Sequence, residues 1–394
     1  MTLALAEKKS VLGATALVAG CCIGAATLGL PVLSLSAGFI PSSIAIFFSY
    51  LFTTVTGLLL LEATLWFDQK TNLLSISTFS LGSFGKIITG SLFIFLFYSI
   101  FIAYMDGGGA LFSNFIESVF GIQYPYFLGV LSYITLVGIV VFLGMGIADK
   151  VNKVLISGLL ATYLTMVLIS LSHVDLQKLS HISWKHSLGT LPILFICFGY
   201  QNLVPTLVDY LKRDVQALRK VIILGNLIPL CFYLIWNFII LGLVPAECPK
   251  NMVMVSDLLR QVTQTTSILH LSEAFSFFAL TTSFIAVGMS FVDFFSDGLQ
   301  GISFKSDTFR KTFTLFLVFI PPLILCFIYP HVFLKALDFA GGVIDVLLFG
   351  ILPVLFVWSG RYIKKIESPY KVGGGKFFLL SVLGVCLFLL LLRI

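Results

Sequence analysis

Long apolar runs dominate the pattern of hydrophobic and polar positions along the chain. Eleven such runs are separated by short polar segments, at approximately 11–35, 39–61, 87–115, 126–148, 154–171, 189–210, 221–244, 272–296, 312–329, 333–358 and 377–392. A helix that crosses the hydrocarbon core of a bilayer needs about 20 mostly apolar residues. The pattern therefore predicts an all-α polytopic membrane protein with eleven spans.

The composition excludes a soluble globular protein. Of the 394 residues, 58% are hydrophobic and 11% are charged, whereas a soluble domain carries roughly 25% charged residues. We expect one transmembrane domain over residues 1–394, surrounded by the lipid bilayer. The seven Cys form no CxxC pair and no His lies at ligand spacing from them, so we predict neither a disulfide framework nor a metal or other cofactor.

The distribution of Lys and Arg predicts the orientation in the membrane. With the N-terminus in the cytoplasm, 18 of the 24 basic residues fall on the cytoplasmic side, as the positive-inside rule requires. An odd number of spans then places the C-terminus in the periplasm. The net charge of +6 follows from these loops and gives no reason to expect nucleic acid as a partner. We interpret the first run as a retained helix, because it has no convincing cleavage site.

Two of the runs carry glycines near mid-membrane that are followed by a proline. The first contains Gly20, Gly24 and Pro31, and the sixth contains Gly199 and Pro205. A broken membrane helix exposes backbone polar groups, which must line a cavity. The N-terminus of the second half-helix then favours an anion such as a carboxylate. Close helix packing is the alternative explanation for one such run.

The places of these two runs in the chain favour a binding site over packing. One opens each half, so residues 11–171 and 189–358 are expected to form inverted repeats, with 377–392 as an added helix. Corresponding broken helices in two repeats are a pointer to the substrate site of a transporter. The sequence therefore predicts a transporter.

Four segments together resemble a known family. VAGCCIGAATLGLP (18–31) resembles AGTxIGAGMLGLP, the first-helix signature of the hydroxy and aromatic amino acid permeases. LPILFICFGYQNLVPTLVDY (191–210) resembles the family's SFGFHxxIPSLxxY, and AYMDGGGAL (103–111) resembles AYxxGGGxxL. TSFIAVGMSFVDFFSDG (282–298) resembles TSFLGVxLGLFDFLxDG. The segments follow the family's order and span most of the chain.

The resemblance implies a bacterial inner-membrane symporter with the LeuT-type fold. This fold consists of two five-helix inverted repeats, in which spans 1 and 6 are discontinuous. An eleventh helix is expected to follow the second repeat. Tyrosine and tryptophan permeases are the most similar members, and proton coupling is usual. The chain departs from the family pattern with Cys21 and Cys22 for Thr and a variable residue, Ala26 for Gly, Gln201 for a common His, and Asp106 for a small or polar residue.

The candidate substrate site combines the two breaks. We expect the backbone of residues 20–24 to hold the carboxylate, Phe198 or Tyr200 to stack on an aromatic side chain, and Gln201 and Asn202 to bond a phenol or indole N–H. The aromatic residues could instead face lipid, whereas polar amides in mid-membrane turn inward. The substrate-binding candidates are Gly20, Cys21, Cys22, Ile23, Gly24, Ala25, Tyr98, Phe198, Gly199, Tyr200, Gln201, Asn202, Ser283 and Phe284.

Asp345 and Asp106 are the candidates for proton coupling, because a carboxyl inside a membrane is costly and by default functional. Asp345 lies deepest in its run, and burial favours the protonated form of a carboxyl, which a proton carrier needs. Sodium is the alternative coupling ion, with the hydroxyls of Thr281, Thr282 and Ser283 as ligands.

An enzyme is not expected, because neither HExxH nor GxSxG occurs. The segment SLGSFGKI (80–87) lacks the first Gly and the Ser or Thr of a P-loop, which argues against an ATP-driven pump. We predict a secondary active transporter that imports tyrosine, tryptophan or both by proton symport with alternating access, and no obligatory protein partner. The alternatives are a serine or threonine permease and, from a different class, a channel or a membrane sensor.

Overall fold

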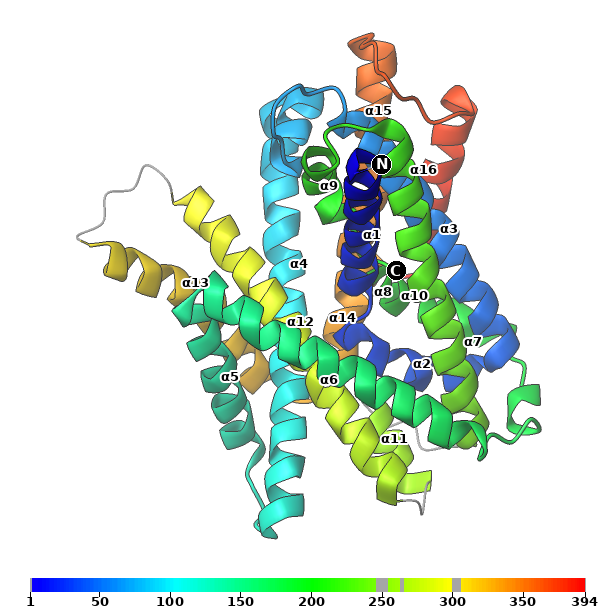
Figure 1. Cartoon of the computed structure of the whole chain (residues 1–394), viewed down its shortest axis with the longest axis vertical. Coiled ribbons are helices and arrows are strands. Elements are labelled where there is room, and N and C mark those ends of the chain that lie inside the picture. The colour runs from blue at the N-terminus through cyan, green and yellow to red at the C-terminus, as the bar shows by residue number, and fades with distance from the viewer. Residues whose placement is uncertain (1, 246–253, 263–265, 300–305, 394) are drawn as a thin grey trace.

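The computed structural model describes residues 2–245, 254–262, 266–299 and 306–393 (Figure 1). Within these ranges all regular structure is helical, and nine helices are long and apolar enough to cross a membrane. A pair of helices bent by 49° at the first apolar run adds a tenth candidate. The apolar helix Gly375–Leu391 lies at the last run. Helices therefore occupy every apolar run of the sequence, which confirms the all-α membrane fold.

The helical elements follow one another along the chain with short connections. In order they are α1 (Thr2–Cys22), η1 (Ala25–Leu28), α2 (Leu30–Ala37), α3 (Phe39–Thr64), α4 (Leu73–Phe120), α5 (Tyr126–Leu143), α6 (Met145–Leu171), η2 (Lys178–Ser180), α7 (Trp184–Ser187), η3 (Leu188–Thr190), α8 (Leu191–Cys197), η4 (Gln201–Leu203), α9 (Val204–Tyr210), α10 (Val215–Leu243), α11 (Val255–Val262), α12 (Thr266–Gly298), α13 (Asp307–Ile328), α14 (Phe333–Phe339), η5 (Ala340–Ile351), α15 (Leu352–Trp358), η6 (Ser359–Ile363) and α16 (Gly375–Leu391).

Local sequence signals set several of these boundaries. Proline occupies the first turn of α2, α8, α9 and α15, where its missing N–H has no helical partner to lose. The Asn72 side chain accepts a hydrogen bond from Ser75 N at 2.9 Å and caps α4, and Asp214 caps α10 in the same way. Gly121 ends α4 in the left-handed conformation, with φ 66°, which glycine adopts without steric cost.

The helix α4 is longer than its apolar run because it is bent. Gly82 has φ 75° and ψ −162°, so the segment 73–81 turns back beside the start of the span. Thr89 Oγ1 donates to Ser77 Oγ across the bend at 2.8 Å. The apolar run begins only after this bend, because the short segment carries polar positions among its apolar ones.

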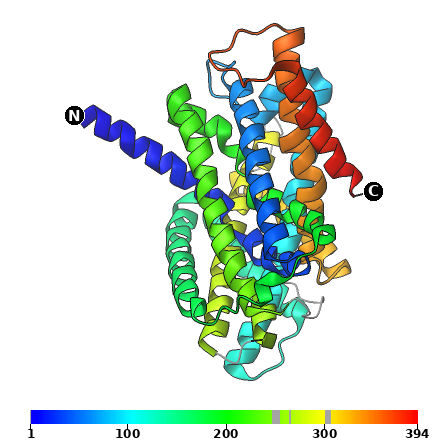
Figure 2. The ribbon, with the colours of Figure 1, turned by 90° about the vertical axis from the view of Figure 1, so that its right-hand side faces the viewer.

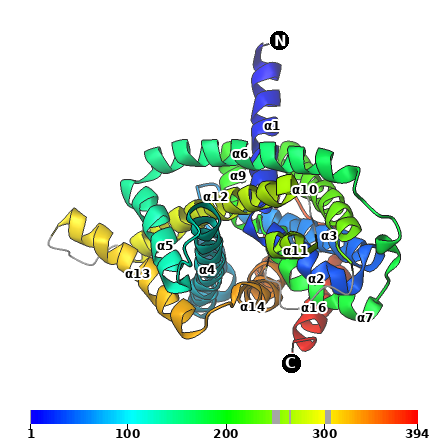
Figure 3. The ribbon, with the colours of Figure 1, turned by 90° about the horizontal axis from the view of Figure 1, so that it is seen from below.

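The long helices form a bundle from which α1 projects. The closest partners are α6 with α12, α4 with α5, and α10 with both α1 and α3. The N-terminal end of α1 leans away from the bundle (Figure 2), and the view from below places α16 on the side opposite to it (Figure 3). The tenth span consists of α14, the π-helix η5, α15 and the π-helix η6.

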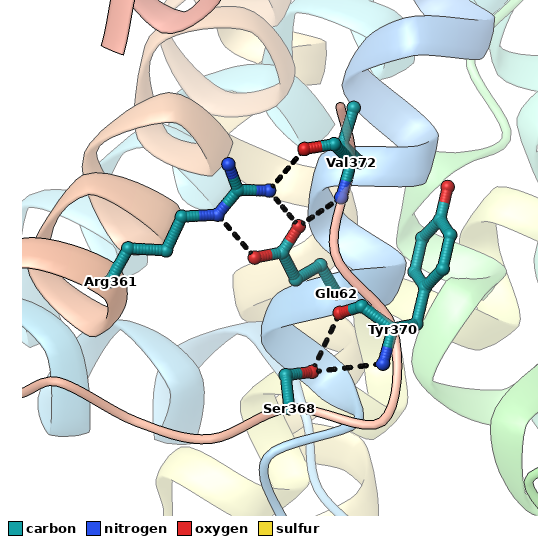
Figure 4. Close-up of polar contacts among 5 residues, drawn as sticks. All are labelled: Glu62, Arg361, Ser368, Tyr370 and Val372. Atoms are coloured by element: carbon teal, nitrogen blue, oxygen red, sulfur yellow. Dashed lines mark hydrogen bonds and ion pairs between the residues drawn. The ribbon is translucent and has the colours of Figure 1, made fainter. Parts of the chain in front are cut away.

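A buried ion pair joins α3 to the end of the tenth span (Figure 4). The Glu62 carboxylate accepts hydrogen bonds from Arg361 Nε at 2.6 Å, Arg361 Nη2 at 2.5 Å and Val372 N at 2.7 Å. Arg361 Nη2 also donates to Val372 O at 2.7 Å. Glu62 is fully buried. In the connection between η6 and α16, Ser368 Oγ donates to Tyr370 O. The segment that leads to α16 is thus fixed against the end of α3.

Candidate functional site

The first break separates α1 from η1. Helix α1 ends at Cys22, and Gly24 is extended, with φ −152° and ψ −157°. The Ala25 N–H donates to Ser283 Oγ on α12 at 3.1 Å. A Cβ atom on Gly24 would clash with the same hydroxyl. Glycine at this position is therefore required for the close approach of the broken helix to α12.

The break leaves backbone groups of the first span without helical partners. In a continuous helix Gly24 N–H would donate to Gly20 O, but among the described residues neither group makes a hydrogen bond. Gly20 and Cys21 are exposed, and a Cβ on Gly20 would meet no atom within 4 Å. Backbone groups away from water nearly always have a hydrogen-bond partner. The free N–H and carbonyl of this segment are therefore available to form hydrogen bonds with a ligand.

The second break separates α8 from α9. Helix α8 ends at Cys197, residues 198–200 are not helical, and η4 leads into α9 with Pro205 in its first turn. Tyr200 N donates to Phe198 O at 3.1 Å, which makes a tight turn. The two discontinuous spans are therefore the first and the sixth, as the sequence predicted.

Tyr233 of α10 joins the two breaks. Its hydroxyl lies 2.5 Å from Cys22 O and 3.1 Å from Cys197 O, the carbonyls at the ends of α1 and α8. Cys21 Sγ adds a second link and donates to Gly199 O at 3.6 Å. The hydroxyl has one proton, which the two carbonyls share. The ends of both half-helices are thus held together in the middle of the bundle.

Helix α10 supplies further polar contacts to the first span and to α3. Trp236 Nε1 donates to Thr27 O at 3.1 Å. The Asn226 amide donates to Thr54 Oγ1 at 2.8 Å and Thr53 Oγ1 at 3.0 Å. Sequence reasoning missed Tyr233, Trp236 and Asn226. The available signal was a polar group inside the apolar run 221–244, where such groups usually have a buried partner.

Three of the predicted site residues in the sixth span are buried in contacts with α3 and α10. Tyr200 OH donates to Thr53 O at 3.1 Å, and the ring lies against Gly57 of α3. Gln201 Nε2 lies 3.4 Å from Thr56 Oγ1. Phe198 packs edge-on against Tyr233, with ring centroids 5.3 Å apart. All three are buried, whereas Asn202 is exposed.

Tyr98 and Phe284 make their contacts in the aromatic layer between α4, α12 and α13. Tyr98 OH donates to Leu317 O at 2.9 Å, and its ring is edge-on to Phe291 at 5.1 Å. Phe284 is fully buried and lies edge-on to Phe101 at 4.9 Å. Of the predicted residues on α4 and α12, the structure brings only Ser283 into contact with a break.

Asp345 is a buried carboxyl in the π-helix η5. Its exposed fraction is 6%, and among the described residues it makes no hydrogen bond or ion pair. The π-helix packs on α8, where a Cβ on Gly341 would clash with Pro192 O. Burial of an unpaired carboxylate is costly, so a carboxyl at this position is expected to have a function. π-Helical turns are frequent at functional sites.

Asp106, in contrast, is fully engaged at the start of α14. Its carboxylate accepts hydrogen bonds from His331 N at 2.7 Å, Phe333 N at 3.0 Å and the Tyr126 hydroxyl. Asp106 therefore fixes the corner between α13 and the tenth span. In the described part of the chain, no three His, Cys, Asp or Glu side chains are grouped as a metal site would require.

The fold is the LeuT-type arrangement of two five-helix repeats with an eleventh helix. It is similar to the structure described as the inward-facing conformation of Mhp1, with a TM-score of 0.64 and 15% sequence identity over 95% of this chain and 84% of that chain.

The sequence comparison then defines the family. The model of the tryptophan/tyrosine permease family matches residues 7–393, and the chain belongs to this family. The tyrosine-specific transport system 1 of Haemophilus influenzae is 30% identical, over 94% of this chain and 93% of the relative. The tryptophan-specific transport protein of Pseudomonas aeruginosa is 27% identical, over 94% and 90%. The family expected from the sequence motifs is confirmed, and the chain is a transport protein and not an enzyme.

Proposed function

We propose that this protein imports tyrosine, tryptophan or both across the bacterial inner membrane, by proton symport with alternating access. The observation that carries the proposal is the pair of helix breaks joined by Tyr233, with unpaired backbone groups beside Gly20. Paired broken helices at the centre of two repeats are suited to bind a zwitterion, because a break in a helix frees both N–H groups and carbonyls of the backbone. The names of the two relatives give the aromatic substrate class.

The first break is the proposed site of the substrate carboxylate. Gly24 N–H is unpaired, and it lies at the start of the second half-helix, where the dipole favours an anion. The carbonyl of Gly20 is the proposed acceptor for the substrate ammonium. Gly20, Cys21 and Gly199 are small, which leaves room for an aromatic side chain. Phe198 packs on α10, and Tyr200 and Gln201 contact α3. These contacts are proposed to hold the second break in place beside the substrate.

Asp345 is the proposed proton carrier. It is buried and has no hydrogen-bond or ion-pair partner in the described part of the chain, whereas protonation of Asp106 would weaken three hydrogen bonds that hold the start of α14. The hydroxyls considered for sodium are already engaged: Thr281 with Tyr133, Thr282 with Asn152, and Ser283 with Ala25 N. These contacts favour a proton over sodium as the coupling ion.

The proposed orientation has the N-terminus in the cytoplasm and the C-terminus in the periplasm. The excess of Lys and Arg in alternate loops supports it. The outward lean of α1 in Figure 2 is the arrangement expected of a state that is open toward the side of the N-terminus.

Uptake of labelled tyrosine into proteoliposomes tests the proposal. A proton gradient and a sodium gradient are imposed separately, with protein-free liposomes as the control. Accumulation under the proton gradient, with competition by tryptophan and not by serine, is the expected result. Uptake of labelled serine without uptake of tyrosine would instead indicate a serine or threonine permease. Flux of tyrosine without accumulation under any gradient would indicate a channel.

A further inference from the structure

The bend of α4 creates a hollow at one end of the bundle. The segment 73–81 folds back beside the start of the span, and the hollow lies where these two parts of α4 meet. It has a volume of about 590 Å³ and is open on one side. Its walls are formed by Asn72, Leu74, Ser75, Thr78, Phe79 and Lys86. The hollow is distant in the fold from the two helix breaks, and the proposed transport cycle does not use it.

Two lysines place positive charge at this hollow. Lys86 forms part of its wall and is exposed. Lys364 follows η6 at the end of the tenth span, and its Nζ atom lies 4.7 Å from the centroid of the Phe79 ring. Among the described residues neither lysine has a carboxylate within ion-pair distance. One charge in the wall of the hollow, on Lys86, and one next to its Phe79 wall, on Lys364, therefore have no carboxylate partner among the described residues.

Exposed apolar residues adjoin both lysines along the chain. Phe84 is 73% exposed, Ile87 67% and Ile363 70%. They lie where the span of α4 begins and the tenth span ends, and the ends of membrane spans lie near the boundary between headgroups and acyl chains. Free Lys beside exposed aromatic and aliphatic residues at this depth is typical of contact with phospholipid. A free phosphate ion would gain nothing from the apolar rim.

We propose that this hollow binds an anionic phospholipid of the adjacent leaflet. Its phosphate lies between Lys86 and Lys364, its headgroup contacts the polar side chains of Ser75 and Thr78, and its acyl chains follow Phe84 and the neighbouring apolar rim. The lipid would bridge the start of the third span and the end of the tenth. The inference uses none of the residues assigned to the substrate.

Lipid retention by the full-length protein tests the inference. The purified protein in detergent is titrated with phosphatidylglycerol or with phosphatidylcholine of the same acyl chains, and bound lipids are counted by native mass spectrometry. We expect phosphatidylglycerol to bind more tightly, and the affinity to fall roughly fivefold for each lysine removed in Lys86→Gln/Lys364→Gln. The matched control is Lys150→Gln/Lys311→Gln, because Lys311 also lies over a ring, that of Phe142, at 4.7 Å, but lines no part of the hollow.

A second variant tests the space in the hollow independently of the two lysine charges. Ser75→Trp fills the hollow and leaves both lysines, so it is expected to lose phosphatidylglycerol while keeping the melting temperature of the wild type. Equal binding of the two lipids, equal losses in the lysine variant and its control, or unchanged binding to Ser75→Trp would each overturn the proposal. Competition by soluble glycerophosphoglycerol at concentrations similar to the lipid would also overturn it, because that result would assign a phosphate site without a role for the acyl chains.

Discussion

At Gly24, a single added carbon atom would disturb the first break, because a Cβ atom would clash with Ser283 Oγ. Its backbone is extended, a conformation open to any residue, so only the contact with Ser283 Oγ requires glycine. The cost of a substitution therefore comes from the neighbouring helix and not from the backbone of Gly24 itself.

Gly24→Ala is expected to lower tyrosine uptake and stability, because overpacking at a tight contact costs roughly 1–3 kcal/mol. Ser283→Ala in the same chain removes the clashing hydroxyl, and uptake should then recover in part. Initial rates of uptake and thermal unfolding in detergent would be measured for both single variants and the double variant. Additive losses would mean that Gly24 and Ser283 do not act on each other.

Tyr233 has a role that depends on two carbonyls far apart in the sequence. Its hydroxyl lies between the ends of α1 and α8, so it connects the two spans that are proposed to enclose the substrate. A tyrosine whose hydroxyl met only one carbonyl would contribute to stability without positioning the two breaks relative to each other.

Tyr233→Phe is expected to reduce the affinity for substrate more than it reduces stability. Loss of the hydroxyl leaves buried carbonyls unpaired, at a cost of about 1–3 kcal/mol. Tyr163→Phe is the matched control, because Tyr163 OH donates to a single carbonyl, Phe232 O, at 3.3 Å. KM for uptake and the melting temperature would be compared. If both variants changed KM equally, Tyr233 would have only a structural role.

Among the helices, the contact of α3 with the tenth span depends on a buried charge pair. Glu62 is fully buried, and the Arg361 side chain is 10% exposed. Removing one partner of such a pair leaves the other charge buried and uncompensated, whereas an exposed pair contributes little.

Glu62→Gln is therefore expected to destabilise the protein by about 3–5 kcal/mol. Asp149→Asn breaks the exposed pair with Lys153 and is expected to cost about 0.5 kcal/mol or less. Thermal unfolding of the two variants in the same detergent measures the difference. A similar shift in both would show that the Glu62 pair is not more important than a surface pair.

The helices and the two breaks could be predicted from the sequence, whereas most partners of the polar residues could not. Apolar runs and glycine–proline spacing are local signals, and they located the spans and the breaks. For Asp106 the sequence shows the depth in the span and not the contacts of the carboxylate. Its partners His331 and Phe333 lie more than 200 residues away, and no local pattern encodes that contact. The π-helix η5 packs on α8, far away in the sequence, and the apolar pattern of its run does not distinguish a π-helix from an α-helix.

Coupling of substrate movement to a proton is a property of the entire transporter, because it requires the binding site and the proton carrier to respond to the same change of access. Asp345 lies in the tenth span on the π-helix that packs against α8. Helix α8 ends at the second break, where Cys197 O meets Tyr233. A change in the charge of Asp345 would therefore act on a helix that leads directly to the proposed substrate site.

Asp345→Asn should separate proton coupling from substrate binding. Asn resembles the protonated acid in size and charge, so the site is expected to bind and exchange tyrosine, but a proton gradient can no longer drive accumulation. Asp338→Asn is the control, because Asp338 is paired with Arg393 at 2.7 Å and is 38% exposed; it should retain both activities.

Exchange of labelled for unlabelled tyrosine and accumulation under a pH gradient would be measured in the same proteoliposomes. Full accumulation by Asp345→Asn would remove this residue from the mechanism, and loss of exchange in a variant that melts like the wild type would assign it to the substrate site instead.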